Sequence, residues 1–375
     1  MRISLIGTRG VPARYGGFET CVEEVGSRLV TLGHEVTVYC RRTRACADAR
    51  ADPDSYRGMR LVHLPAVRHK VLETPSHTAV SMLHGAARAT PDAAFVFNAA
   101  NAPLLPLLRA RGVPVATHVD GLEWRRAKWG KTGQRYYRLA ERIAVRWSDA
   151  LIADARGIQD YYRERFSAPS DYIPYGAPIL RDVGSSRLAG LGLRSGRYHL
   201  VVARFEPENH VHLAVEGYLA STARYPLVVV GTAPYAGDYT ASIERMAAGH
   251  EGVRLLGAVW DQELLDELYA NALTYIHGHS VGGTNPSLLR AMGAGTATLA
   301  FDVGFNREVL GQWGRYFGSA TELAELCTTA EAELEQTLAR GRAQRVELKH
   351  YDWDQVASAY AELAERLADG SRARR

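Results

Sequence analysis

The chain alternates short apolar runs, rich in β-branched and aromatic residues, with longer stretches of helical periodicity. In its first half the apolar runs are Arg2–Ile6, Glu35–Tyr39, Arg60–Leu64, Ala94–Phe97, Val113–His118 and Ala150–Ala153. In its second half they are Tyr198–Ala203, Leu227–Val230, Val253–Leu256, Leu273–Ile276 and Thr296–Phe301. Strands that alternate with helices form parallel sheets with helices on both faces. The pattern therefore predicts an α/β protein built from doubly wound, Rossmann-like units.

Helical stretches lie between these runs, and two of them are well marked. The first carries an apolar stripe at steps of three and four residues, ended by Gly33: Phe18, Val22, Val25, Leu29 and Leu32. The second, near Asp354–Leu367, places four apolar side chains on one face: Val356, Tyr360, Leu363 and Leu367.

A length of 375 residues favours two domains over one. The segment Gly176–Gly196 has little periodicity and is interpreted as the linker. We expect an N-terminal domain over 1–180, a C-terminal domain over 181–350, and a terminal helix in 351–375 that packs back on the first domain. Two such domains place the ligand cleft between them, at the carboxyl ends of their strands.

Composition narrows the class of protein. Hydrophobic residues make up 46% and charged residues 23%, as in ordinary globular domains. No run approaches the roughly 18 apolar residues of a membrane-spanning helix, and the start of the chain fits a first strand better than a secretory signal. The four cysteines, Cys21, Cys40, Cys46 and Cys327, form no disulfide framework and no CxxC pair. We therefore expect a cytoplasmic protein.

A net charge of +4 is too small to indicate a nucleic-acid partner. The stretch Arg125–Arg146, however, holds eight Lys or Arg against one acid, Glu141. It is predicted to be helical from about Thr132, with the apolar and aromatic stripe Tyr136, Leu139, Ile143 and Trp147. Two interpretations stay open: a packed helix with a solvated face, or a peripheral contact with anionic lipid headgroups at the inner membrane face.

No metal site is expected. The pairs Asp52/Asp54 and Asp352/Asp354 do not follow cleft-forming strands and are interpreted as structural. His277 and His279 alternate along a predicted strand, so they should point to opposite faces.

Polar and glycine residues follow several predicted strands. Gly16 and Gly17 open the first helix and suit either an anion or a plain turn, while the dinucleotide fingerprint is missing. Further candidates lie at strand ends. His118 suits either a structural role or a ligand contact, and Asp120 and Glu123 follow it. Arg204 can hold a diphosphate or pair with Glu206 or Glu208, and Gly231 follows the next predicted strand.

The longest such loop follows the run Leu273–Ile276. It contains Gly282, Gly283, Thr284, Asn285 and Ser287, with Asn285 as the expected helix N-cap and Pro286 in the first turn. Its backbone N–H groups and the helix dipole suit a diphosphate or sugar hydroxyls.

Four segments together resemble the retaining glycosyltransferases of family 4, in their rhamnosyltransferase-like branch: GTRGVPARYGGFET, HVDGLEWRRAKWG, ARFEPEN and HSVGGTNPSLLRAMG. The resemblance covers nearly the whole chain and implies the GT-B fold. It also implies that Gly16 and Gly17 lie near the donor phosphates and acceptor, that His118 contacts the donor sugar, that Arg204 binds the diphosphate, and that the loop Gly282–Ser287 wraps sugar and phosphates.

Three positions depart from the family pattern. Many members have glutamates where this chain has Gly282 and Arg290, and a lysine where it has Asn209. The second glutamate accepts hydrogen bonds from the nucleotide ribose, which Arg290 cannot do. Three explanations stay open: a deoxyribose donor such as dTDP, an added phosphate-binding charge, or lost activity.

The expected enzyme moves a hexose or deoxyhexose, such as rhamnose, from a dTDP-, UDP- or GDP-sugar to a saccharide, lipid-linked or small-molecule acceptor. It needs no cofactor, and Asp120 or Glu123 would orient or deprotonate the acceptor, unless Glu123 pairs with Arg125 or Arg126. The competing hypotheses are an inactive sugar-nucleotide-binding homologue, a sugar-nucleotide epimerase and a nicotinamide dehydrogenase.

Overall fold

The computed structural model describes residues 1–13, 16–42, 53–69, 72–88, 90–119, 121–127, 129–232 and 237–373. The chain divides into two compact units. The first combines Met1–Gly176 with Asp352–Arg375, and the second is Ala177–Tyr351. The C-terminal segment therefore belongs to the first unit, and residues 177–196, which were interpreted as a linker, belong to the second.

The first unit holds an eight-stranded sheet in the order β3-β4-β2-β1-β5-β6-β7-β8. Its strands are β1 (Arg2–Ile6), β2 (Glu35–Arg41), β3 (Ser55–Tyr56), β4 (Met59–Leu64), β5 (Ala93–Phe97), β6 (Val115–His118), β7 (Ala150–Ala153) and β8 (Asp171–Tyr172). All pairs are parallel except β3 with β4. The central strand β5 is buried along its whole length, as expected for a sheet covered on both faces.

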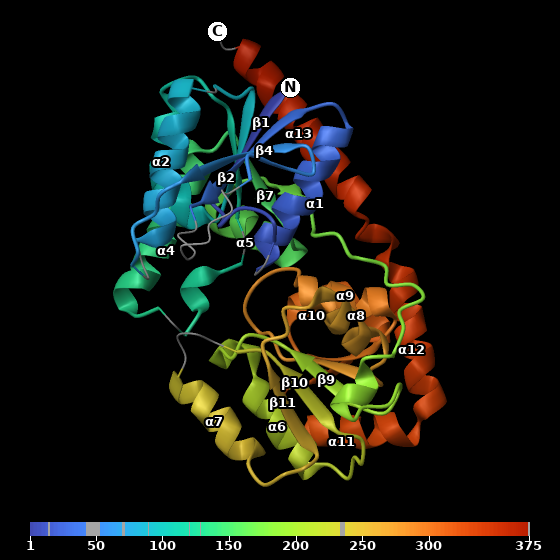
Figure 1. Cartoon of the computed structure of the whole chain (residues 1–375). Coiled ribbons are helices and arrows are strands. Elements are labelled where there is room, and N and C mark those ends of the chain that lie inside the picture. The colour runs from blue at the N-terminus through green and yellow to red at the C-terminus, as the bar shows by residue number, and fades with distance from the viewer. Residues whose placement is uncertain are drawn as a thin grey trace, which may run out of the picture. The chain divides into compact units, whose positions relative to one another are not determined.

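Helices cover both faces of this sheet, with α1 and α2 on opposite sides (Figure 1). The helices of the unit are α1 (Gly17–Thr31), α2 (Glu73–Arg88), η1 (Ala99–Leu104), α3 (Pro106–Arg109), η2 (Glu123–Arg125), α4 (Lys131–Trp147), α5 (Arg156–Phe166) and α13 (Trp353–Ala373). The terminal helix α13 lies beside α1, and its Tyr360 ring packs edge-on against Phe95 of β5 at 4.9 Å between centroids. Thus α13 completes the core of the first unit.

The second unit holds a six-stranded parallel sheet in the order β11-β10-β9-β12-β13-β14. Its strands are β9 (His199–Val202), β10 (Leu227–Val230), β11 (Val253–Gly257), β12 (Thr274–His277), β13 (Ala297–Phe301) and β14 (Arg315–Phe317). Its helices are η3 (Leu188–Leu191), η4 (Pro207–Asn209), α6 (Val211–Ala220), α7 (Gly237–Ala247), α8 (Gln262–Ala270), α9 (Pro286–Ala294), α10 (Gly304–Leu310), η5 (Gly311–Trp313), α11 (Ala320–Ala332), α12 (Leu334–Glu347) and η6 (Leu348–His350). Figure 1 shows α6, α7 and α11 on one side of the sheet and α8 and α9 on the other.

Each sheet has a point where the strand order reverses. In the first unit it lies between β1 and β5, and in the second between β9 and β12. In open α/β sheets, ligands bind outside the carboxyl ends of the strands at this point. The fold therefore directs attention to the segments after β1, β5 and β6 in one unit and after β9 and β12 in the other.

The predicted α/β class is confirmed, and all eleven predicted strands are present within two residues of their expected bounds. The structure adds three short strands, β3, β8 and β14, which have only two or three residues each. One predicted stripe residue is wrong: Leu32 is 52% exposed, because α1 ends at Thr31. No helix among the described residues is long and apolar enough to cross a membrane.

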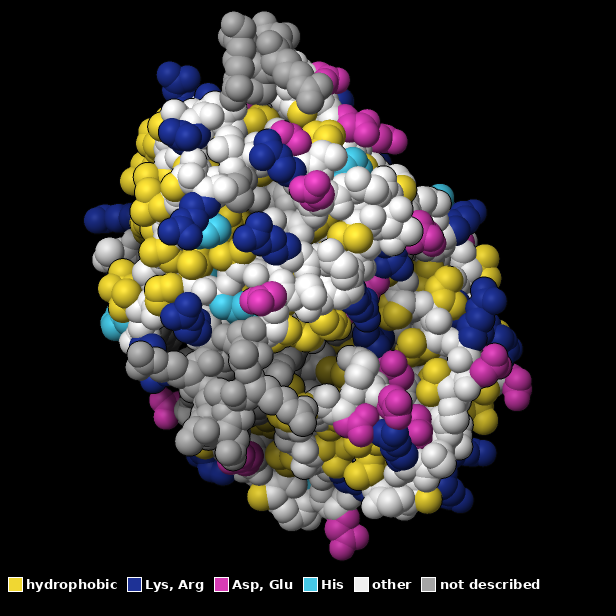
Figure 2. Space-filling model, turned by 45° about the horizontal axis from the view of Figure 1, so that its top comes forward, with side chains coloured by type: hydrophobic (Ala, Val, Ile, Leu, Met, Phe, Trp, Pro, Cys, Tyr) yellow, Lys and Arg dark blue, Asp and Glu magenta, His cyan; other side chains and the backbone are white. Residues whose placement is uncertain are grey.

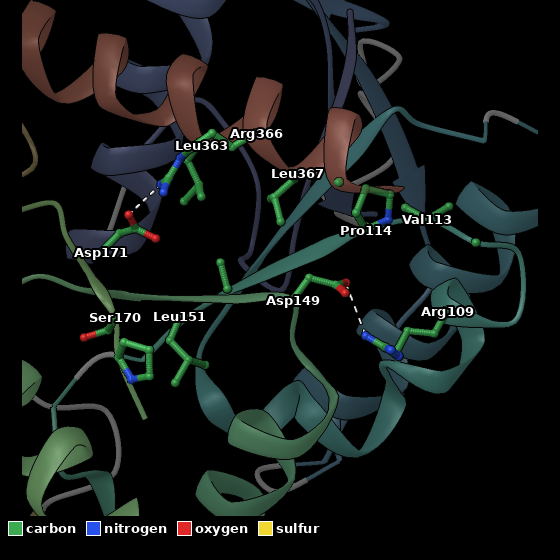
Figure 3. Close-up of a pocket in the computed structure, with 14 residues that line it drawn as sticks. Arg109, Val113, Pro114, Asp149, Leu151, Ser170, Asp171, Leu363, Arg366 and Leu367 are labelled. Atoms are coloured by element: carbon green, nitrogen blue, oxygen red, sulfur yellow. Dashed lines mark hydrogen bonds and ion pairs between the residues drawn. The ribbon is translucent and has the colours of Figure 1, made fainter. Parts of the chain in front are cut away.

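A cavity of about 600 Å³ opens at the amino ends of β6, β7 and β8, beneath the last turns of α13 (Figure 3). An ion pair closes each side: Arg109 lies 3.2 Å from Asp149, and Arg366 lies 2.6 Å from Asp171. The carboxylate of Asp149 also accepts the backbone N–H of Val115 at 3.0 Å. The cavity therefore lies at the opposite edge of the sheet from the carboxyl ends, and the pair of Arg366 with Asp171 ties α13 to that edge.

Candidate functional site

In the second unit, Arg204 follows the carboxyl end of β9 by two residues. Its side chain is 41% exposed, and one guanidinium nitrogen lies 3.4 Å from Glu206 Oε1. The ion pair considered as an alternative for Arg204 is thus present, but it is long and leaves much of the guanidinium open to solvent. A further anion can approach the open side, where two parallel N–H groups suit a phosphate.

The segment after β9 and the segment after β12 are joined by hydrogen bonds into one surface. Ser280 donates its backbone N–H to the carbonyl of Glu208 at 2.9 Å, and the His210 ring lies 2.7 Å from the carbonyl of Gly278. A Cβ at Gly278 would come within 2.2 Å of the Asn209 carbonyl, so the two backbones approach more closely than any other residue allows. The predicted candidates on the two segments therefore lie on a common surface at the switch point.

Asn209 stabilises the turn after β9 by a hydrogen bond. Its Nδ2 donates to the carbonyl of Arg204 at 2.9 Å, which closes the turn that carries the arginine. At this position the resemblance predicts a phosphate-binding lysine, and the buried amide supplies no positive charge. Arg204 is thus the cation that this turn presents.

Helix α9 begins as the sequence predicts. Asn285 is its N-cap, with Oδ1 accepting the Ser287 N–H at 3.0 Å, and Pro286 occupies the first turn. Gly282 has φ of +141° and nothing within 4 Å of its missing side chain, whereas Gly283 and Thr284 are buried. Pro286 has no N–H and the cap occupies that of Ser287, so what this helix N-terminus offers an anion is the positive end of its dipole.

The expectation for His277 and His279 is wrong. Strand β12 ends at His277, so strand alternation does not extend to His279, and the two rings stack with centroids 4.4 Å apart. Burial lowers the pKa of His277 to about 3, so its ring is neutral. Across the described residues, no three His, Cys, Asp or Glu side chains are grouped to hold a metal ion.

Gly231 follows β10 and has φ of +148°. A Cβ there would lie 1.8 Å from the Ala203 carbonyl, which belongs to the segment that leads to Arg204. The glycine thus permits the turn after β9 to pack against the turn after β10. The structure gives it a backbone role in shaping the site.

In the first unit, His118 is the last residue of β6 and is almost fully buried. Its ring stacks between Phe97 and Tyr175, with centroids at 5.5 and 5.9 Å, and meets the edge of Phe18 at 5.3 Å. Burial lowers the pKa of His118 to about 3. The neutral ring can donate or accept one hydrogen bond per nitrogen but cannot act as a cation.

Phe18 belongs to the first turn of α1, so the Gly16-Gly17 turn and His118 lie in one region of the first unit. Glu19 accepts the Arg9 N–H at 3.0 Å, and its carboxylate lies 2.4 Å from where a Cβ of Gly16 would be. This negative charge in the first turn opposes an anion at the helix N-terminus. The turn glycine pair, the alternative in the sequence analysis, fits these contacts.

Glu123 is occupied by neighbours. One carboxylate oxygen lies 2.6 Å from the Arg126 guanidinium, and the other accepts the Trp129 indole N–H at 3.1 Å. The ion pair weighed for Glu123 is therefore present, and no oxygen is left without a partner for acceptor activation. Asp120 lies outside the described residues.

Sequence reasoning missed the partner of Arg290. Its guanidinium pairs with Asp266 of α8, which lies 24 positions earlier and also accepts from Gln262 at 3.0 Å. Two of the aspartates that the sequence analysis interprets as structural can be compared with this. Asp352 caps α13 by accepting two backbone N–H groups. Asp52 lies outside the described residues.

Two family models match the chain, one in each unit. Residues 16–176 match the glycosyl transferase 4-like domain, and residues 194–335 match glycosyl transferases group 1. The chain is a glycosyltransferase with the GT-B fold. The predicted glycosyltransferase class and GT-B architecture are thereby confirmed.

This glycosyltransferase is similar to three proteins at 15–27% sequence identity. The O-antigen chain mannosyltransferase B of Escherichia coli is 27% identical over 155 residues, which cover 40% of this chain and 39% of that protein. The sucrose-phosphate synthase of Thermosynechococcus elongatus has a TM-score of 0.83 at 19% identity, over 98% of this chain and 99% of that one. Anabaena HepE, solved in complex with UDP-glucose, has a TM-score of 0.75 at 15% identity, over 98% of this chain and 100% of its own.

On the face drawn in Figure 2, the side chains of the described residues form no broad basic field. Lys and Arg side chains are scattered there among hydrophobic, acidic and uncharged ones. A nucleic-acid partner would leave a continuous basic stripe as its electrostatic footprint.

Proposed function

We propose that the protein transfers a sugar, with retention at the anomeric carbon and without a metal ion, from a nucleoside diphosphate sugar to a saccharide-containing acceptor. The second unit would bind the donor diphosphate at its switch point. The observation that carries this proposal is the hydrogen-bonded junction between two segments of the second unit. The segment after β9 carries the exposed Arg204 guanidinium, and the segment after β12 leads to the capped N-terminus of α9. Charge on the leaving diphosphate would be neutralised by this arginine and by backbone dipoles.

In the proposed reaction, the acceptor hydroxyl attacks the anomeric carbon from the face that the diphosphate leaves. The bond from that carbon to the leaving oxygen breaks, and a departing phosphate oxygen takes the hydroxyl proton. The neutral His118 would bind a hydroxyl of the donor sugar, because its buried ring stays uncharged at physiological pH. Glu123 needs no part in this mechanism, since both of its oxygens are engaged.

We further propose that the donor is a deoxyribonucleoside diphosphate sugar such as dTDP-rhamnose. The pairing of Arg290 with Asp266 favours this over a phosphate-binding role, because the aspartate already balances the positive charge. UDP- and GDP-sugars remain the alternatives. HepE was solved with UDP-glucose, so the donor panel includes it.

We propose a lipid-linked saccharide as the acceptor, and the exposed face of α4 supports this choice. Arg135, Arg142 and Arg146 are exposed along it, with Leu139 53% and Tyr136 39% exposed between them. Basic side chains around exposed apolar ones suit an anionic lipid surface. We propose that this face brings the protein to the membrane.

Nucleotide release tests the proposal most directly. We would incubate the protein with dTDP-rhamnose, other dTDP-sugars, UDP-sugars and GDP-sugars, with and without EDTA and a mixed lipid-saccharide acceptor extract. Acceptor-dependent release of one nucleotide, unchanged by EDTA, is expected, and NMR of the product would show the retained anomeric configuration. Donor binding without release would instead support an inactive homologue, and conversion of the donor without acceptor would support an epimerase.

A further inference from the structure

The hydroxyl of Tyr275 touches all three elements that converge at the switch point of the second unit. It lies 3.2 Å from the carbonyl of Val202 at the end of β9, 3.1 Å from Nδ1 of His277 at the end of β12, and 2.9 Å from Oγ of Ser287 in the first turn of α9. The side chain is fully buried in the middle of β12. No other residue type offers a rigid ring with a hydroxyl at that reach.

Counting protons gives this cluster a direction. Ser287 donates its hydroxyl proton to Asn285 Oδ1 at 2.7 Å, so its oxygen accepts the single hydroxyl proton of Tyr275. The Val202 carbonyl, 3.2 Å from the Tyr275 hydroxyl, competes for the same proton at the longer distance. The Tyr275 oxygen then accepts from His277, whose neutral ring carries a single N–H that this chain places on Nδ1. The chain runs from His277 through Tyr275 and Ser287 to the amide of Asn285.

The last hydrogen bonds of this series fix the orientation of the Asn285 amide. Oδ1 of Asn285 accepts both the backbone N–H and the hydroxyl of Ser287, so the oxygen must point inward. Nδ2 therefore points away from the helix, and it has no hydrogen-bond partner among the described residues. Its two N–H groups are donors, which suit a negatively charged group and not a cation.

We propose that Tyr275 is a positioning residue that holds the Asn285 amide with its Nδ2 donors toward the donor diphosphate. This inference rests on the proposed function for the identity of the ligand. The positioning itself is a property of the unliganded chain. Tyr275 acts only through Ser287 and Asn285, whereas Asn285 would touch the substrate.

The central experiment compares Tyr275→Phe with Tyr198→Phe. Tyr198 is a matched control: it is equally buried in the same unit, and its hydroxyl donates to the Leu268 carbonyl at 2.6 Å, which is not part of the chain of hydrogen bonds. Each variant removes one buried hydroxyl, so both should lower Tm by a similar amount. Only Tyr275→Phe should speed amide hydrogen exchange across residues 285–289, and only it should weaken calorimetric binding of UDP, dTDP or GDP, by about tenfold.

Variants of Asn285 test the direction of the amide. Asn285→Ser keeps an N-cap oxygen but removes the Nδ2 donors, and Asn285→Asp keeps the cap and places a negative charge where those donors were. Both should retain Tm within a few degrees, while nucleotide binding should fall about tenfold for Ser and about a hundredfold for Asp. Unchanged binding in Asn285→Asp would overturn the inference.

The two proposals fail in different ways. If hydrogen exchange at 285–289 is the same in Tyr275→Phe and Tyr198→Phe, Tyr275 holds nothing in place, whatever the protein binds. If exchange rises as expected but the native protein binds none of the three nucleotides, the proposed function is wrong. In that case the positioning by Tyr275 still stands.

Discussion

The guanidinium of Arg290 on α9 is paired with the carboxylate of Asp266 on α8, and both side chains are largely buried. The pair joins two helices on the same side of the second sheet. An arginine has only hydrogen-bond donors, so this position cannot accept a bond from a ribose hydroxyl, and its charge is already balanced by Asp266. The relationship therefore predicts how the protein discriminates between nucleotides.

The native protein should bind dUDP as tightly as UDP, because these two differ only in the 2′-hydroxyl. Replacing Arg290 by Glu in an Asp266→Asn background supplies an acceptor without setting two carboxylates against each other. This double variant should favour UDP over dUDP by about ten- to a hundredfold, the contribution of one hydrogen bond to a charged acceptor. Isothermal titration calorimetry gives both affinities.

Arg245→Glu is the control for that comparison. It makes the same charge reversal on an exposed position of α7, and its preference should equal that of the native protein. A double variant that binds dTDP-sugar more tightly than the native protein does would contradict the deoxyribose hypothesis.

His118 should make stability depend on pH. Its folded pKa is about 3, whereas an exposed histidine titrates near 6.5, so the unfolded chain binds an extra proton between these values. Above about pH 6.5 this ring does not affect the free energy of unfolding. Between pH 6.5 and pH 3 it lowers the free energy of unfolding by about 1.4 kcal/mol for each unit by which the pH falls. Urea unfolding of His118→Gln should therefore lose less stability than the native protein between pH 7 and pH 5, by about 2 kcal/mol.

The His118 ring should not contribute to the pH dependence of kcat/KM. A group that stays neutral from pH 5 to 9 contributes no inflection to kcat/KM in that range. His118→Gln should lower activity by a constant factor at every pH. A native inflection near pH 6 that disappears in the variant would mean that His118 titrates when substrate binds.

Two glycines with similar backbone angles should respond differently to alanine. Gly231 and Gly282 have φ of +148° and +141°, so each substitution carries a conformational cost of roughly 1–3 kcal/mol. At Gly231 the new Cβ would also lie 1.8 Å from the Ala203 carbonyl, whereas at Gly282 nothing lies within 4 Å. Gly231→Ala should therefore lower Tm by several degrees more than Gly282→Ala and displace the turn that carries Arg204. Equal Tm values would show that the close approach at Gly231 relaxes without cost.

The strands were predictable because a parallel sheet buries both of its faces, so its inner strands are rich in apolar residues, and β5 and β10 are unbroken apolar runs. Two of the edge strands are too short to carry this signal: β8 is only Asp171–Tyr172, and β14 is three residues long. The N-cap of α9 was also predictable, since Asn285 and Pro286 act within one turn. Local rules of this kind need no knowledge of the rest of the fold.

Contacts between distant segments were not predictable. Asp266 and Arg290 are separated by a whole strand and loop, and nothing in either segment indicates the other. Tyr275 looks like an ordinary core residue in an apolar run, and its hydroxyl gains meaning only when β9, β12 and α9 meet. These features depend on how elements pack, which the sequence pattern does not specify.

Helix α4 shows the same limit. Its fully buried residues are Ala140, Glu141 and Ala144, none of which belongs to the predicted apolar stripe. Of that stripe, Ile143 and Trp147 are partly buried against the core, whereas Tyr136 and Leu139 are exposed. The two alanines allow α4 to approach η1 closely, so Leu139 is left exposed and Tyr136 reaches the Ala100 carbonyl at 2.7 Å through its hydroxyl. The buried side of α4 is therefore lined by small alanines and not by its larger apolar side chains.

The exposed face of α4 leads to a prediction about membrane binding. Arg142 and Arg146 lie on it beside Leu139. Arg142→Glu should weaken binding to vesicles containing phosphatidylglycerol by more than about tenfold. Each basic residue near an anionic surface contributes about 1 kcal/mol, and this substitution reverses one charge. Leu139→Ser should weaken it less, and uncharged phosphatidylcholine vesicles should bind neither form. Arg194→Glu makes the same charge change on an exposed residue of the second unit and should bind like the native protein. If Arg142→Glu and Arg194→Glu reduce co-sedimentation equally, only net charge matters, and the α4 face is a packed helix with a solvated surface.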